Sequence, residues 1–75
     1  AMAYESIRRG GNVPCVVNAA NEVVNEAFRH DCCGFLQMAD IIEATMQRAT
    51  FVAQPTYDDY IASDAEARRI AASML

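Results

Sequence analysis

Apolar residues recur at intervals of three and four along most of this chain, and this spacing limits the possible folds more than any other feature. Such spacing places the apolar side chains on one face of a helix. No credible strand pattern emerges anywhere in the sequence. The sequence therefore predicts an all-α fold, a small compact bundle of about four helices whose short connections make neighbours antiparallel. The clearest face, in the stretch 38–49, consists of Met38, Ile41, Ile42, Met46 and Ala49.

Start and stop signals divide the chain into segments. Residues 2–9 already read as helix, which suggests a piece cut from a longer polypeptide, and Gly10-Gly11 supplies a left-handed stop. Two pairs, Thr56 with Asp59 and Ser63 with Glu66, fit the reciprocal capping pattern at a helix start. The helices predicted after residue 11 cover 19–31, 38–49, 57–61 and 64 onward.

The stretch 12–17 has two interpretations. Apolar spacing favours a helix that starts near Pro14. A proline beside three valines instead favours an extended segment, followed by a helix that Asn18 caps. The extended interpretation is preferred. The buried face of that helix would then be Ala20, Val23, Val24, Ala27 and Phe28.

The remaining packing expectations concern the turns and the last helix. After the turn at Gly34, Phe35 and Leu36 are expected to enter the core, whereas Phe51 and Val52 look exposed in the loop 50–54. The inward positions of the last helix are expected to be Ala67, Ile70, Ala71 and Met74.

Size and charge exclude several classes of protein. Seventy-five residues allow one helical domain, 1–75, whose own core is marginal. Ten acids against six arginines give a net charge of −4, so neither nucleic acid nor an anionic membrane is an expected partner. No apolar run is long enough to span a membrane, and no signal peptide is recognisable. Three cysteines, two of them adjacent, predict reduced thiols and a cytoplasmic location.

Few residues suggest chemistry. The cluster His30, Asp31, Cys32, Cys33, with Cys15 elsewhere, lacks the two-to-four-residue ligand spacing of a zinc site, and a catalytic Cys–His pair is equally disfavoured. Glycines 10, 11 and 34 do not have phosphate-loop spacing. The sequence thus predicts no catalytic, cofactor-binding or metal-binding residue.

The acidic residues and the asparagines each allow a structural interpretation and a binding interpretation. Glu22 and Glu26 share one helix face and Asp58 and Asp59 are adjacent, but a solvated face and helix-dipole complementation are favoured over a cation site. Asn18, with Asn21 one helical turn later, is interpreted mainly as part of a buried polar network that fixes the start of the helix. The alternative is contact with a neighbouring domain.

Four ordered motifs resemble those of one enzyme family. The stretch 14–23 (PCVVNAANEV) is similar to P-x-V-L-N-A-A-N-E-V, and Ala27-Phe28 is similar to the A-F pair that follows. The stretches 34–43 and 55–68 resemble G-F-L-D-I-x-x-V-I-E and P-T-L-E-D-V-L-A-A-D-A-W-A-R. In this order the motifs resemble those of the 1-deoxy-D-xylulose 5-phosphate reductoisomerases. Gln37 stands where the family usually has aspartate, and Asn25 stands where a small or apolar residue is common.

The resemblance implies the function of a larger parent enzyme. That family rearranges and reduces 1-deoxy-D-xylulose 5-phosphate to 2-C-methyl-D-erythritol 4-phosphate for isoprenoid biosynthesis, with NADPH and a divalent metal, Mg or Mn. This chain resembles only the helical C-terminal domain, which implies a non-catalytic fragment whose partner is the enzyme's own catalytic domain, in a homodimeric parent. Self-association of the fragment through exposed apolar surface is expected. The alternatives are an independent helical adaptor and, as the weakest, a small enzyme.

Overall fold

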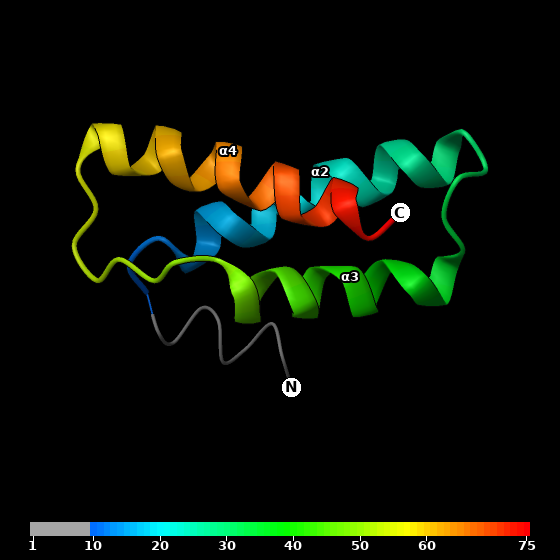
Figure 1. Ribbon diagram of the computed structural model, residues 1–75, viewed down its shortest axis with the longest axis horizontal. Helices are drawn as coiled ribbons and strands as arrows, with labels where there is room; N and C mark the ends of the chain where they lie inside the picture. The colour runs from blue at the N-terminus through cyan, green and yellow to red at the C-terminus, as the bar shows by residue number, and fades with distance from the viewer. Residues whose placement is uncertain (1–9) are drawn as a thin grey trace.

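Three helices make up the part of the chain that the structure, a computed structural model, describes, residues 10–75 (Figure 1). They are α2 (Val13–Arg29), α3 (Phe35–Arg48) and α4 (Tyr57–Ser73). Residues 10–75 contain no strand, so the all-α prediction is confirmed. Residues 10–75 contain three helices, slightly fewer than the predicted count of about four. The predicted segment 2–9 lies outside the described residues.

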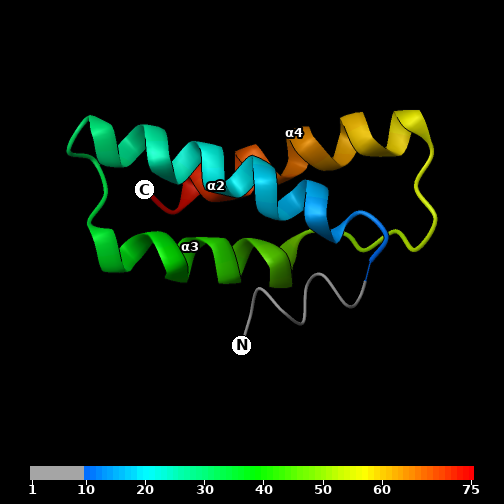
Figure 2. The ribbon, with the colours of Figure 1, turned by 180° about the vertical axis from the view of Figure 1, so that it is seen from behind.

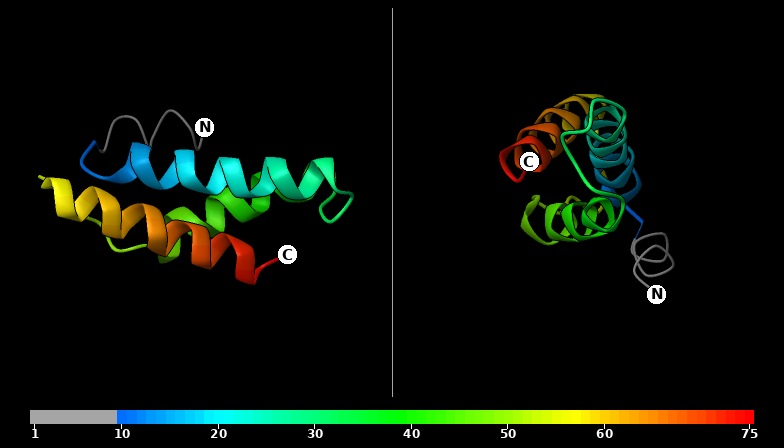
Figure 3. Two further views of the ribbon diagram at one scale, coloured as in Figure 1. Left: turned by 90° about the horizontal axis from the view of Figure 1, so that it is seen from above. Right: turned by 90° about the vertical axis from the view of Figure 1, so that its right-hand side faces the viewer.

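The helices run up, down and up. Seen from behind, α2 and α4 lie side by side and point the same way, while α3 returns antiparallel beneath them (Figure 2). The end-on view shows the three helices at the corners of a triangle (Figure 3). Consecutive helices are therefore antiparallel, and α2 contacts both of the others. No helix within residues 10–75 is long and apolar enough to cross a membrane.

The first described helix starts earlier than predicted, so the extended interpretation of 12–17 is wrong. α2 begins at Val13, and Pro14 lies in its first turn, where a missing N–H costs no intrahelical bond. The side chains of Val13 and Val16 are buried in the bundle, which stabilises the helical conformation of this stretch. Asn18 is consequently an exposed residue inside the helix and not its N-cap.

The last helix is continuous, so the predicted break between 61 and 64 is also wrong. The capping pair at its start is confirmed: Asp59 N–H donates to Thr56 Oγ1 at 3.2 Å, and Thr56 N–H donates to Asp59 Oδ2 at 2.9 Å. Ser63 and Glu66 have other partners. The Ser63 hydroxyl accepts a bond from another segment, and Glu66 accepts from the backbone N–H of Thr50 at 2.8 Å.

Small side chains form the seam between α2 and α4. One buried cluster consists of Val16, Ala19 and Ala67, with no exposed surface on the two alanines. Alanine lets helix backbones approach closely, so α4 packs on α2 although it carries few large apolar residues. The second cluster, to which α3 contributes Ile41, consists of Ala20, Val24, Ala27, Cys33, Ile41 and Ala71. The inward positions predicted for Ala20, Val24, Ala27, Ala67 and Ala71 are confirmed.

The large aromatic and aliphatic residues near the α2–α3 turn are the main error in the predicted core. Phe35 is 73% exposed and Leu36 is 83% exposed, and both lie in the first turn of α3, which begins at Phe35. Phe28 is 43% exposed and meets Phe35 edge to face, with ring centroids 6.2 Å apart. These residues therefore form an exposed apolar patch. In the loop, Phe51 is exposed as predicted, whereas Val52 is half-buried.

Candidate functional site

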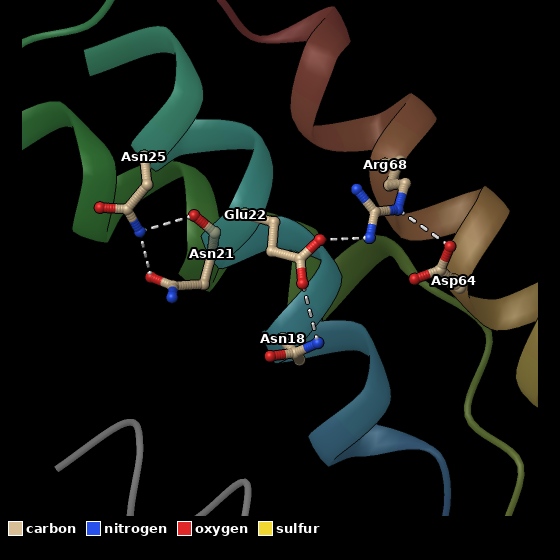
Figure 4. Close-up of polar contacts among 6 residues, drawn as sticks. All are labelled: Asn18, Asn21, Glu22, Asn25, Asp64 and Arg68. Atoms are coloured by element: carbon tan, nitrogen blue, oxygen red, sulfur yellow. Dashed lines mark hydrogen bonds and ion pairs between the residues drawn. The ribbon is translucent and has the colours of Figure 1, made fainter. Parts of the chain in front are cut away.

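The most distinctive sequence segment, residues 18–22, divides between the two faces of α2. Ala19 and Ala20 are fully buried in the bundle, whereas Asn18, Asn21 and Glu22 are exposed. Helical geometry causes this division, because adjacent residues are about 100° apart around the axis. The polar half of the segment thus faces outward, where it is available for contact with another surface (Figure 4).

Glu22 belongs to a polar chain that bridges α2 and α4 (Figure 4). Arg68 Nη2 donates to Glu22 Oε1 at 2.6 Å, and Arg68 Nε donates to Asp64 Oδ2 at 2.9 Å. The second oxygen of Glu22 accepts from Asn18 Nδ2 at 3.4 Å. Hydrogen bonds to Asp64 and Glu22 raise the pKa of the Arg68 guanidinium. The single positive charge of Arg68 is therefore shared between two carboxylates, one on each helix.

The expected buried network of Asn18 and Asn21 is wrong. Asn25 Nδ2 donates to the carbonyl oxygen of Asn21 at 2.7 Å and to its Oδ1 at 3.0 Å, on the side of α2 that faces away from Arg68 (Figure 4). All of these bonds are local to one helix turn. The alternative interpretation, contact with a neighbouring domain, is the one consistent with this exposure.

A buried polar node does fix the start of α2, but Asn12 forms it. Its side chain is fully buried. Asn12 Nδ2 donates to the Thr50 carbonyl at 2.7 Å and to Ser63 Oγ at 2.8 Å, while Asn12 Oδ1 accepts from Val52 N–H at 2.8 Å. This side chain therefore joins α2, the loop after α3 and α4. Its place directly before the helix was the only sequence signal, and that signal indicates a cap and not a tertiary node.

Gly11 directly precedes Asn12, and both the lack of space for a side chain and the backbone angle require glycine at this position. Gly11 has φ +57°, and a Cβ at this position would lie 2.3 Å from the Val52 carbonyl oxygen. The two backbones meet here because Asn12 N–H donates to that same oxygen at 3.0 Å. Gly11 and Asn12 together hold the loop 50–52 against the start of α2.

The histidine–cysteine cluster does not converge. His30 Nε2 lies 2.9 Å from Glu26 Oε1, Cys32 is exposed, and Cys33 is buried in the core. Cys15 lies apart from them, with its Sγ 3.6 Å from the Tyr60 carbonyl. Burial and the nearby Asp64 carboxylate raise the pKa of the Cys15 thiol, which keeps it protonated. Within residues 10–75 no three His, Cys, Asp or Glu side chains are grouped as metal ligands.

The acids on the outer faces have partners in the domain. Arg29 and His30 both contact Glu26, and these hydrogen bonds, with that from Arg29 the larger cause, lower the pKa of Glu26. Asp59 caps α4, and Asp58 lies beside it in the first turn, where the helix dipole favours negative charge.

An open groove of about 890 Å³ lies between α2 and the end of α4. Its charged lining residues are those of the ion pairs above: Glu22, Glu26, Arg29, His30 and Arg68. A nicotinamide dinucleotide needs cations or backbone N–H groups aimed at its phosphates, and a divalent metal needs converging free carboxylates. Because these side chains already neutralise one another, the groove does not fit either group.

Comparison with known proteins identifies the class to which this helical fold belongs. The sequence model of the DXP reductoisomerase C-terminal domain matches residues 1–70, and the chain belongs to this family. The chain is 65% identical over 75 residues to the 1-deoxy-D-xylulose 5-phosphate reductoisomerase of Bacteroides thetaiotaomicron, covering 100% of this chain and 19% of that protein. No solved structure gave a significant match.

Further relatives carry the same name. The Phocaeicola vulgatus enzyme is 56% identical over 75 residues, covering 100% of this chain and 20% of that protein. A Bacillus cereus enzyme is 43% identical over 67 residues, covering 89% of this chain and 18% of that protein. The chain thus spans about a fifth of the length of these relatives.

Proposed function

We propose that this chain is the C-terminal supporting domain of a 1-deoxy-D-xylulose 5-phosphate reductoisomerase. The observation that carries the proposal is the family match over residues 1–70, together with 65% identity to a protein of that name over all 75 residues. The parent enzyme converts 1-deoxy-D-xylulose 5-phosphate to 2-C-methyl-D-erythritol 4-phosphate with NADPH and Mg²⁺ or Mn²⁺ in the cytoplasm. An independent adaptor is not favoured, because the relatives carry the name of an enzyme.

In this proposal the chain itself is a single non-catalytic domain, residues 1–75, with no catalytic, cofactor or metal residue of its own. The ion pairs that Glu22, Glu26 and Arg68 form within residues 10–75 support this, because they engage these charged side chains of the groove inside the domain. Burial and the nearby Asp64 raise the pKa of the half-buried Cys15 thiol, which disfavours the thiolate that a nucleophile requires. The NADPH and metal sites would belong to the rest of the enzyme.

The partner of the domain would be the catalytic part of its own polypeptide, in a homodimeric enzyme. The exposed side chains of Phe35, Leu36, Tyr57 and Ile61 support this, because the isolated domain leaves unusually large apolar groups in water. We expect the same groups to cause self-association of the isolated 75 residues at high concentration.

The test compares the full-length chain that carries this domain with the 75 residues alone. Oxidation of NADPH in the presence of the sugar phosphate and Mg²⁺ should require the full-length chain, and calorimetry should detect no micromolar binding of NADPH or Mg²⁺ to the 75 residues. Turnover by the 75 residues alone, or a full-length chain without this activity, would contradict the proposal.

A further inference from the structure

α2 carries a second stripe of residues at helix–helix contact spacing. It lies about 100° around the helix from the core, because four of its five members directly follow the buried residues Val13, Ala20, Val24 and Ala27. The intervals between its members are four, three, four and three residues, which is the repeat of a helix seam. Four of the five side chains are exposed and Asn25 is half-buried. This set, the asparagine stripe, consists of Pro14, Asn18, Asn21, Asn25 and Phe28.

The asparagine stripe is uncharged along its whole length. The three charged residues of α2, which are Glu22, Glu26 and Arg29, lie beside the stripe and are each paired within the domain. By contrast, the exposed face of α3 carries Asp40 and Glu43. A solvated helix face normally bears charges, whereas the buried centre of a protein interface is depleted of them.

The three asparagines also act against helix formation. Asparagine ranks low in helix propensity because its amide competes for backbone groups. The bonds that these side chains make are confined to α2, and Asn21 Nδ2 has no partner within residues 10–75. A free amide that both donates and accepts matches the polar groups of another protein segment. The three asparagines of the stripe, whose hydrogen bonds within residues 10–75 all stay on α2, are explained by contact with something outside the domain.

We propose that the asparagine stripe docks on the catalytic part of the same polypeptide, an inference that rests on the proposed function. About four-fifths of the length of the relatives lies outside this chain, so a large protein surface is available to cover it. The neutral stripe suits a protein surface better than a phosphate or a metal. At Phe28 the stripe continues into the aromatic pair with Phe35, which supplies an apolar end to the contact.

Docking in this way makes α2 the central helix of the assembled enzyme. Its buried side, with Ala20 and Val24, packs on the bundle, and its outer side packs on the preceding part of the chain. The Glu22–Arg68–Asp64 chain borders the stripe and holds α4 in register beside it. The catalytic part would then be supported by a helix that the bundle already holds rigid.

Photo-crosslinking tests the location and the occupant together. A benzoylphenylalanine at position 21 of the full-length chain should give crosslinks within one chain, to the part that precedes this domain. The matched control is position 47, where Gln47 lies exposed on α3 and should give few such crosslinks. Crosslinks from position 21 to a second copy of the chain, or equal intrachain yields from positions 21 and 47, would overturn the docking proposal.

A charge placed in the stripe gives an independent readout. Asn21→Arg in the full-length enzyme should lower kcat/KM by about tenfold, because an interface core does not accommodate an unpaired charge. Gln47→Arg should leave kcat/KM unchanged. Circular dichroism of the 75-residue Asn21→Arg chain should show helix content and melting as in the unmodified chain. If the full-length enzyme is active and both substitutions change kcat/KM equally, the docking proposal is refuted and the proposed function stands. If the unmodified full-length chain is inactive, the proposed function is refuted.

Discussion

Asparagine has opposite roles in two regions of this molecule. Asn12, at the start of α2, is fully buried and bonds the Thr50 carbonyl, the Ser63 hydroxyl and the Val52 N–H. Asn18 and Asn21, along the outer side of the same helix, are exposed, and within residues 10–75 they bond only to groups of α2. The same amide is therefore part of the domain's own stability in one region and available to a partner in the other. The chemistry of a side chain does not assign its role; its surroundings do.

The largest expected loss of stability comes from a substitution at Gly11, whose backbone contacts Val52 next to the buried Asn12. Gly11→Ala should destabilise the domain by about 3 kcal/mol or more, because the new Cβ would meet the Val52 carbonyl at 2.3 Å in a backbone with φ +57°. Gly10→Ala is the matched control: φ is +69° but no atom lies within 4 Å, so the cost should be only about 1 kcal/mol. Urea denaturation measures both, and equal costs would show that the contact with the loop does not form.

Asn12→Ala should cost about 2–3 kcal/mol, because it leaves buried partners on three segments without a hydrogen bond. Ser63→Ala removes only one of these partners and should cost about 1 kcal/mol. The difference in the urea midpoint between the two variants measures how much the node depends on Asn12 itself. If Asn12→Ala lowers the free energy of unfolding no more than Ser63→Ala does, Asn12 is not the centre of the buried node.

Asn18→Ala should change stability in the opposite direction. Alanine is the better helix former by about 0.5 kcal/mol, and among the described residues the substitution removes only the 3.4 Å hydrogen bond to Glu22. The 75-residue chain should therefore gain a few tenths of a kcal/mol, which a small rise in melting temperature would report. If the substitution instead destabilises the chain as Asn12→Ala does, the contrast between the two regions is wrong.

The smallest effect is a pH dependence at the end of α2. Hydrogen bonds from Arg29 and His30 lower the pKa of Glu26 from its ordinary value of 4.5. The stability that this carboxylate contributes is present above pH 4.5 and is lost as the pH falls through the lowered value. Urea midpoints measured across this range should vary less with pH in Glu26→Gln. Arg29→Gln should reduce the same slope, and an unchanged slope in both variants would contradict the assignment.

Local signals in the sequence predicted the parts of the fold that local physics controls. Apolar spacing indicated the three helical regions and the inward alanines at 67 and 71. The Thr56–Asp59 pair was recognised because both partners lie within one turn. Of the candidate site, the sequence indicated the distinctive residues 18–22 but placed their polar side chains in the wrong environment.

The errors share one physical cause, which is that their outcome depends on residues distant in sequence. Ser63 looks like a cap, yet its hydroxyl binds Asn12, so α4 runs through without a break. Phe35 and Leu36 are apolar enough for a core, but they stay exposed in the first turn of α3, because the packing of the other helices decides which positions are covered.

The sequence by itself determined that the chain is helical, where its strongest cap lies and to which family it belongs, because these depend on periodicity, short-range bonds and matched motifs. Only the tertiary structure decided which asparagine is buried and which asparagines face outward. That decision follows from the packing of α4 and the loop 50–52 on the start of α2, which encloses Asn12 and leaves Asn18 and Asn21 exposed.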